Sequence, residues 1–306
     1  MTLSDESTER IGLLYAAARR NGSLVSVQEL SRLLPEMASE SEVEAAILSD
    51  TSLSSRFELK SGYLTERSED LQPDPLLLEA ESRRVARANL SHASKLVPLL
   101  LPSGFIVVAV SGSTSYGSAS LSRDADLFCV APPGRMWVSL AKGLLIARAY
   151  GLVNRRAPNF CLSCVMDEAY AHSVFRLQGH PLFARDALEA KVLVGRGSYK
   201  SLLKTAGWMS DYFPFAYREA IMDSPEASKI QRRPALARIL NRLLFLTLSR
   251  YIRVKSSLLN RNLRAGGRSG DLFRVRCGED HLIYESRRYV DLRREYEIAE
   301  PAKFTS

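Results

Sequence analysis

One stretch decides the fold class: Val107-Val-Ala-Val-Ser-Gly-Ser-Thr-Ser-Tyr-Gly-Ser-Ala-Ser-Leu-Ser-Arg-Asp-Ala-Asp-Leu-Phe-Cys-Val130. It reads as an apolar run, a Gly-Ser corner, a loop of small residues and a second apolar run that begins with Asp-x-Asp. Carboxylates are costly to place in a strand that is otherwise apolar. Residues two apart in a strand project from the same face. The pattern therefore predicts a mixed sheet in which Asp124 and Asp126 hold a divalent metal ion together.

The corner between the two apolar runs predicts an anion site. Gly112 and Ser113 lie where the first strand is expected to turn into a short helix, and backbone N–H groups at such a corner bind anions. Phosphates at the corner and a cation on the carboxylates together indicate a nucleotide site. Ser115 is expected to line that site, although a plain loop explains it equally well. Arg123 either reaches a phosphate or simply begins the strand.

The first 70 residues read as a separate module. Helical spacing over 9–20 is followed by a capping box that opens a second helix at Ser26 and by a third helix over 40–49. Two short strands around a turn are expected over 57–65. Three helices followed by a hairpin is the order of a winged helix-turn-helix.

That order usually suggests DNA binding, but the charge of the module argues against it. The third helix carries Glu40, Glu42, Glu44 and Asp50 and no Lys or Arg, and residues 1–75 have a net charge of −7. Carboxylates are repelled by the phosphates of a nucleic acid. We therefore expect this module to contact protein or the rest of this chain, and we expect no DNA partner.

Residues 76–180 are expected to contain the sheet. Two prolines make Gln72-Pro-Asp-Pro75 a linker, because proline is not tolerated inside a helix. A helix over 76–99 leads into the strand at 105–110. After Asp126 come a helix at 137–149 and a strand at 159–166. The fold class that results is α+β.

Residues 181–306 are predicted to be mainly helical, with helices within 183–221, 234–260 and 289–299. The segment 227–270 contains eleven Lys or Arg and no Asp or Glu. Its arginines between 238 and 264 fall mostly on one side of the helix. RNA or another polyanion is one expected partner of this basic face. Solvent and the acidic N-terminal module are the alternatives.

Composition indicates a soluble globular protein. The chain has 306 residues, of which 46% are hydrophobic and 25% are charged, and its net charge is +8. No apolar stretch reaches membrane-spanning length without a charge, and the N-terminus lacks the basic-then-apolar order of a signal peptide. We therefore expect a cytoplasmic protein without membrane association. Cys161 and Cys164 lie three apart in a predicted strand, so we interpret them as buried thiols and not as zinc ligands.

Gly-Ser, a spacer of ten residues, and Asp-x-Asp between apolar residues resemble the DNA polymerase β-like nucleotidyltransferase superfamily. The resemblance implies that Gly112 and Ser113 bind the phosphates of a nucleoside triphosphate and that Asp124 and Asp126 bind two Mg²⁺ ions. The strict motif covers about twenty residues, and the order of elements extends the likeness over roughly 78–170. The segments 159–168, 183–214 and 281–296 resemble, more loosely, uncharacterised prokaryotic proteins that join an N-terminal winged helix to such a domain.

One departure from the family pattern bears on catalysis. Active members usually add a third carboxylate from the next strand, but 160–166 contains no acid. Ser163 occupies the inward position on this strand. Asp167 shares its parity and is expected to face the site from one edge of the sheet. In the family the third acid helps to hold the catalytic metal and accepts the hydroxyl proton.

Two hypotheses follow. In the first, the protein is a Mg²⁺-dependent nucleotidyltransferase that moves a nucleoside monophosphate to a hydroxyl of an RNA, protein or small-molecule acceptor, with Asp124, Asp126 and Asp167 as catalytic residues. In the second, it is a regulator or adaptor that keeps the fold and binds nucleotide or RNA with weak or absent transfer. A third carboxylate beside Asp124 and Asp126 favours the first, and Ser163 alone favours the second.

Overall fold

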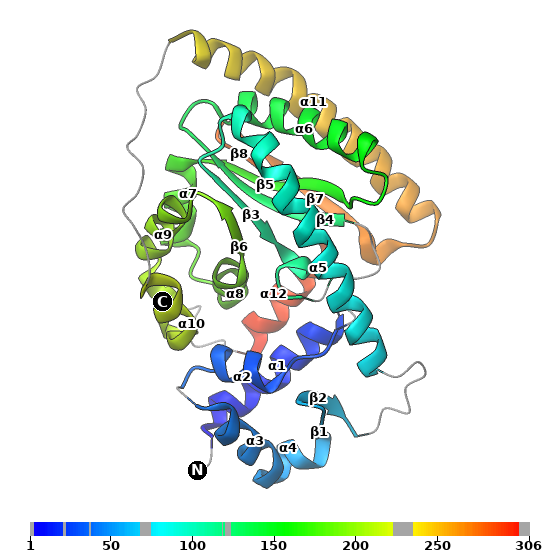
Figure 1. Ribbon diagram of the computed structural model, residues 1–306, viewed down its shortest axis with the longest axis vertical. Coiled ribbons are helices and arrows are strands. Elements are labelled where there is room, and N and C mark those ends of the chain that lie inside the picture. The colour runs from blue at the N-terminus through cyan, green and yellow to red at the C-terminus, as the bar shows by residue number, and fades with distance from the viewer. Residues whose placement is uncertain are drawn as a thin grey trace.

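A six-stranded mixed sheet organises the larger part of the chain (Figure 1). The computed structural model describes residues 3–20, 23–36, 38–67, 75–117, 119, 124–222 and 235–299. The strand order is β6-β3-β4-β5-β8-β7, in which β4 and β5 are parallel and the other neighbouring pairs are antiparallel. The strands are β3 (Val107–Ser111), β4 (Asp124–Ala131), β5 (Asn159–Asp167), β6 (Lys191–Val194), β7 (Phe273–Cys277) and β8 (His281–Ser286). The fold is α+β with a mixed sheet, as the sequence predicts.

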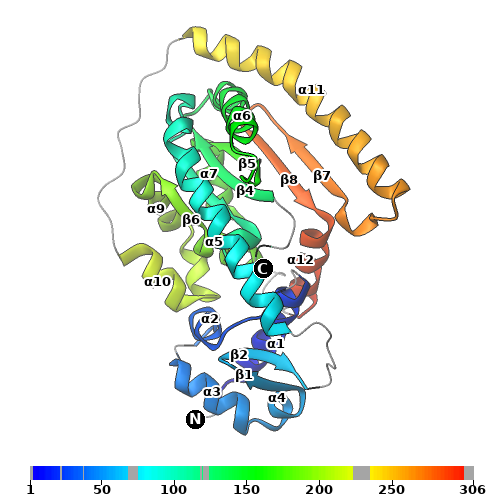
Figure 2. The same cartoon turned by 45° about the vertical axis from the view of Figure 1, so that its right-hand side comes forward.

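Three long helices cover one face of the sheet (Figures 1 and 2). They are α5 (Pro75–Leu100), α6 (Met136–Val153) and α11 (Ala235–Ala265). Trp137 of α6 is fully buried, and its backbone N–H donates to Asn241 Oδ1 of α11 at 2.8 Å. By length and composition alone α6 is apolar enough to cross a membrane, but here it packs against β5, α5 and α11.

Shorter helices cover the opposite face. These are α7 (Glu168–Leu177), α8 (Pro181–Glu189), α9 (Arg196–Thr205), α10 (Pro214–Met222) and α12 (Arg287–Ala299). Short 3₁₀ turns elsewhere in the chain are η1 (Leu101–Ser103), η2 (Gly112–Thr114), η3 (Gly207–Asp211) and η4 (Ser269–Asp271). Phe128 of β4 meets Phe175 of α7 and Tyr199 of α9, with ring centroids 6.1 Å and 5.9 Å away. Residues of β4 with the parity of Phe128, which include Asp124 and Asp126, therefore point to this face.

The N-terminal module has the predicted order of three helices and a hairpin, with one further short helix. It consists of α1 (Asp5–Arg20), α2 (Val27–Leu33), α3 (Glu40–Ser49), α4 (Thr51–Arg56), β1 (Phe57–Lys60) and β2 (Tyr63–Glu66). The predicted capping box at Ser26 is present, and a second box at Ser39 opens α3. Ser61 and Gly62 both adopt positive φ in the tight turn between the strands.

The module contacts the rest of the chain through α2 and through the start of α5. Arg32 of α2 pairs with Glu219 of α10 at 2.9 Å and with Glu189 of α8 at 3.2 Å. Glu79, near the start of α5, is 2% exposed and accepts a hydrogen bond from the Leu24 backbone N–H at 2.9 Å. Figure 1 shows α5 running from the module along the sheet.

The predicted domain boundary at residue 180 is wrong, because the sheet contains strands from both sides of it. Residues 181–306 are mainly helical, but they also supply β6, β7 and β8, which flank the predicted strands on both sides. The expected helical stretch over 183–221 is interrupted by β6. Gly195 follows β6 at φ 75°, and a Cβ there would collide with the backbone carbonyl oxygen of Ile106. This close approach is a tertiary constraint that helical periodicity does not report.

Candidate nucleotide and metal site

The Gly-Ser corner and the Asp-x-Asp pair meet at one end of the sheet. Ser111, the last residue of β3, pairs with Asp126 in the antiparallel register. Gly112 follows at φ 65°, and a Cβ on it would lie 3.3 Å from Asp126 Oδ2. A side chain at this position would thus press on the carboxylate. The spacing in the sequence brings the two halves of the predicted site together through the register of β3 and β4.

Asp126 is a carboxylate held in a poorly solvated position. Its pKa is raised to about 6, chiefly by burial and to a smaller extent by the nearby charge of Asp124, whereas a hydrogen bond with the Ser163 side chain lowers it. The carboxylate is thus disfavoured as an isolated anion at this place. A cation beside it would relieve that cost.

Asp124 lies at the solvent-exposed start of β4. Its Oδ1 accepts a hydrogen bond from Asn159 Nδ2 at 3.2 Å, which joins the first residue of β4 to the first residue of β5. Asn159 was not singled out in the sequence, because a lone Asn before an apolar strand looks like a strand boundary. Its place opposite Asp124 follows only from the parallel pairing of β4 and β5. The amide orients one oxygen of the carboxylate.

Asp167 is not part of this site, which corrects the prediction made from its parity. It pairs with Ala131, five residues along β4 from Asp126, and at about 3.3 Å per residue this is roughly 17 Å away. Asp167 caps α7 by accepting the Tyr170 N–H at 2.9 Å, and its other oxygen faces the Gly134 N–H at 3.3 Å. The register also shifts between Asp126 and Phe128, which breaks the parity argument.

Ser163 lies near Asp126 in the irregular stretch of β5 that follows Cys161, the register partner of Asp126. It is the side chain that hydrogen-bonds the carboxylate, and no acid of the β5 body accompanies it. Among the residues that the structure describes, no group of three or more His, Cys, Asp or Glu is arranged to hold a metal ion. The site therefore offers two carboxylates and a hydroxyl.

The loop residues have separate roles. Ser115 is 2% exposed, and its hydroxyl and N–H both donate to the Gly112 carbonyl oxygen, at 2.8 Å and 2.9 Å. Its side chain therefore closes the turn and does not face a ligand, which corrects the expectation that it lines the nucleotide pocket. Ser113 is half-buried within η2. Arg123 lies outside the described residues.

The residues present fit a magnesium ion that is shared with a nucleotide. Mg²⁺ typically binds to proteins through one or two carboxylates, while phosphates and water complete its coordination. Asp124 and Asp126 provide that number on one face of β4, and the burial of Asp126 favours a cation there. A fully protein-made cage would need more ligands than this end of the sheet supplies.

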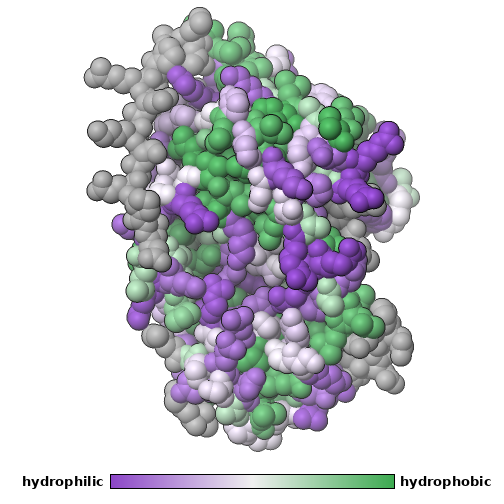
Figure 3. All heavy atoms as spheres, viewed as in Figure 1, coloured by the Kyte–Doolittle hydropathy of each residue, from purple (hydrophilic) through white to green (hydrophobic). Residues whose placement is uncertain are grey.

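The basic face on α11 is solvent-exposed. All six arginines of the predicted face are exposed: Arg238, Arg242, Arg250, Arg253, Arg261 and Arg264. Several apolar residues of α11 are exposed too, among them Leu243 at 56%, Val254 at 61% and Leu258 at 56%. Figure 3 shows hydrophobic and hydrophilic side chains side by side on this upper part of the molecule. The side of α11 that carries Leu244, Phe245, Leu248 and Ile252 packs on the sheet layer.

The likeness to nucleotidyltransferases that the sequence led us to expect rests on the corner and the carboxylate pair. Their geometry is formed by Gly112 on the β3 side and by Asp124 and Asp126 on β4. A scan against protein-family models and searches of the curated proteins and of the solved structures find no match to this chain.

Proposed function

We propose that this protein binds a nucleoside triphosphate together with Mg²⁺, on a nucleotidyltransferase-type fold, and that it transfers the nucleotide weakly or not at all. One observation carries the proposal. Asp126 adjoins Gly112 and Asp124, and the neighbouring position on β5 holds the Ser163 hydroxyl and no carboxylate. Two acids suffice for a magnesium–nucleotide complex. Active nucleotidyltransferases of this type usually have a third carboxylate.

Each residue has a distinct task in this proposal. Gly112 leaves room for phosphate beside Asp126, because any larger residue there approaches the carboxylate. Asp126 and Asp124 hold the cation, Asn159 orients Asp124, and the Mg²⁺ when bound neutralises phosphate charge. Ser163 holds the Asp126 carboxylate by a hydrogen bond but cannot accept a proton from an attacking hydroxyl as a carboxylate would.

The N-terminal module fits a role in contact with the rest of the chain. We propose a winged helix whose third helix, α3, is too acidic for DNA. Its α2 faces α8 and α10 through Arg32, so part of the module surface is already in use. A regulator or adaptor with a nucleotide-sensing domain is consistent with this arrangement.

The test is the binding of Mg·ATP and Mg·GTP to the full chain by calorimetry. We expect saturable binding that is lost when EDTA removes Mg²⁺. Asp126→Asn should weaken it at least about tenfold, because a charge-assisted contact contributes roughly 1.5–3 kcal/mol. Asp211→Asn, a change at an exposed acid in η3, is the matched control and should bind like the wild type. Equal affinity of Asp126→Asn and wild type would overturn the proposal.

A second assay separates binding from transfer. The protein is incubated with nucleoside triphosphate labelled at the α-phosphate and with RNA, protein and small-molecule acceptors. We expect no labelled product above the Asp126→Asn background. A product that depends on Asp124 and Asp126 would instead establish the transferase and show that a third carboxylate is dispensable in this chain.

A further inference from the structure

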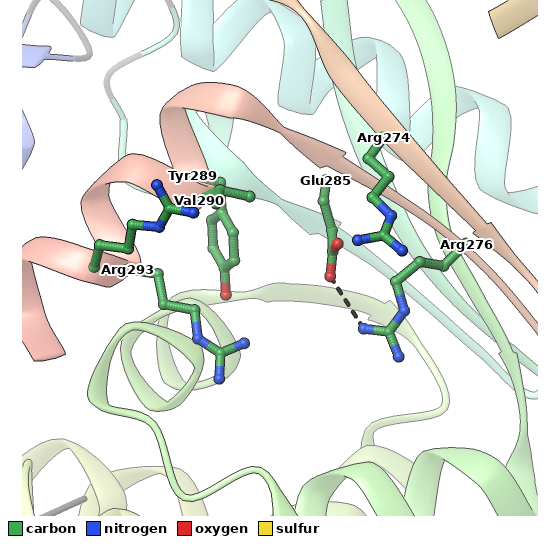
Figure 4. Close-up of a pocket in the computed structure, with 7 residues that line it drawn as sticks. Arg274, Arg276, Glu285, Tyr289, Val290 and Arg293 are labelled. Atoms are coloured by element: carbon green, nitrogen blue, oxygen red, sulfur yellow. Dashed lines mark hydrogen bonds and ion pairs between the residues drawn. The ribbon is translucent and has the colours of Figure 1, made fainter.

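A cavity rich in arginine lies on the same sheet face as Asp126. It has a volume of about 510 Å³ and is lined by Arg274 and Arg276 of β7, Glu285 of β8, and Tyr289, Val290, Arg293 and Arg294 of α12. Four guanidinium groups and one carboxylate leave the lining strongly positive. Figure 4 shows Arg274 and Arg276 beside Glu285, with Tyr289 and Arg293 on the α12 side.

The strand register places the cavity at the end of the sheet that holds the carboxylate pair. Cys164 pairs with Ile283, so Glu285 lies two residues further toward the start of β5, where Asp126 pairs with Cys161. The Cys164 thiol lies between these groups, and besides burial the charges of Asp126 and Glu285 raise its pKa while that of Arg276 lowers it. Strands β4 and β8 are two spacings apart, or about 10 Å.

The chemistry of the lining selects a phosphate. Arginine presents a planar fork of donors that matches phosphate oxygens in two-point contacts. Arg276 is paired with Glu285 at 3.1 Å, whereas no carboxylate among the described residues pairs with Arg274 or Arg294. The cavity also has the size of a small-molecule site.

We propose that this arginine pocket binds the phosphate of a second, phosphorylated ligand beside the nucleotide. This proposal rests on the proposed function, because it assumes that a nucleotide binds at Gly112, Asp124 and Asp126. Gly112 lies on the β3 side of Asp126 and the pocket lies on the β8 side, so the two anionic groups flank the carboxylate pair. The other source of phosphate is the polyphosphate of the nucleotide itself, and the experiment below distinguishes the two.

The probe is inorganic pyrophosphate, titrated into the full chain by calorimetry without Mg²⁺. Arg274→Ala and Arg294→Ala change exposed side chains, so they should fold normally and each weaken binding about tenfold. Glu285→Gln should strengthen binding, because it removes the one negative charge and frees Arg276. Arg250→Ala on α11 is the matched control and should leave the affinity unchanged.

Absence of pyrophosphate binding would overturn the proposal. So would an Arg250→Ala effect as large as that of Arg274→Ala, or a loss of affinity in Glu285→Gln. With pyrophosphate saturating, undiminished binding of Mg·ATP supports a second ligand, whereas competition shows that the pocket holds the phosphates of the nucleotide and overturns the second-ligand proposal. Asp126→Asn should weaken Mg·ATP binding at least about tenfold and spare pyrophosphate, so failure of the pocket and failure of the nucleotide site give different results.

Discussion

At the scale of single residues, the exchange of a carboxylate for a hydroxyl has the largest consequence. Ser163 hydrogen-bonds Asp126 where a transferase of the family has an acid, and Asp167 is committed to capping α7. A serine keeps the neighbouring carboxylate oriented but adds no charge. The side chain at position 163 thus decides whether the site only binds a cation or also supports transfer.

Introducing the missing acid should reveal the cation site through stability. Ser163→Asp adds a third carboxylate beside Asp124 and the half-buried Asp126, and like charges at this distance disfavour the folded state. We expect the melting temperature in EDTA to fall by at least about 2 °C, the shift that 1 kcal/mol produces in a protein of this size. Mg²⁺ should restore it, because an ion that binds only the folded state stabilises it.

Ser163→Asn is the control for this experiment. It removes the hydroxyl without adding charge, so Mg²⁺ should raise its melting temperature no more than that of the wild type. A Ser163→Asp variant that melts identically with EDTA and with Mg²⁺ would show that the two side chains do not share a cation.

Asp186 is expected to make the stability of the protein depend on pH. Asp186 in α8 is largely buried near Tyr199 and Tyr289, and burial raises its pKa to about 8. In the unfolded chain the same group ionises near 4. Between these values the unfolded state releases the proton and the folded state keeps it, so this group favours folding below pH 4 and loses that contribution as pH rises toward 8.

Asp186→Asn should therefore gain stability relative to the wild type as pH increases. The expected result is a difference in melting temperature that grows in favour of the variant between pH 4 and pH 8. Thermal unfolding followed by circular dichroism across this range measures it. A difference that is independent of pH would show that Asp186 ionises normally in the folded chain.

At the scale of elements, α5 is the part that joins the N-terminal module to the sheet. Glu79 accepts hydrogen bonds from Leu24 N–H and from Arg83 Nε at 2.9 Å and 2.6 Å, and Arg83 lies over the Tyr63 ring of β2 at 5.3 Å. Further along, Leu96 and Leu100 of the same helix are fully buried against the sheet layer. The helix α5 is thus bound to the N-terminal module at its start and packed against the sheet further along.

Removal of the Glu79 carboxylate should loosen this junction. Glu79→Ala leaves the Leu24 N–H and the Arg83 guanidinium without their buried acceptor, a loss of about 2–4 kcal/mol. Urea unfolding should show a lower midpoint or an early separate transition of the module. Glu81→Gln, an exposed site on the same helix, is the control and should change the free energy of unfolding by less than about 0.5 kcal/mol. Equal effects of the two changes would contradict the role of Glu79.

At the scale of the whole molecule, the sheet is built from distant parts of the chain. β3, β4 and β5 lie within 107–167, whereas β6, β7 and β8 come from residues 191–286 and occupy both flanks. Without them β3 and β5 would become open edges, and the apolar face of β4 would lose α9 and its Tyr199.

A fragment of residues 76–180 should therefore fail to fold. We expect the purified fragment to show no cooperative thermal transition by circular dichroism, while the full chain shows one under the same conditions. Cooperative melting of the fragment would mean that the three central strands and their helices suffice, and that the flanking strands are additions to a stable unit.

The local elements of this protein could be predicted from the sequence. The apolar runs around Gly112 and Asp126, the capping box at Ser26 and the periodicity of the long helices specify strands, helix starts and helix faces, because these depend on neighbours a few residues away. For the same reason the juxtaposition of Gly112 with Asp126 follows from two strands joined by one loop.

Only the tertiary structure decided which distant residues complete the site. The register shift in β5 brings Ser163 to Asp126 and sends Asp167 to α7, and the pairing of β8 with β5 brings the arginines of β7 and α12 to the same face. The alternation Phe273-Arg-Val-Arg-Cys277 was a signal for a strand with one basic face. The pocket itself is formed by residues close together in the chain, but its place beside Asp126 depends on the pairing of β8 with β5, which joins residues more than a hundred positions apart, and no local pattern encodes that register.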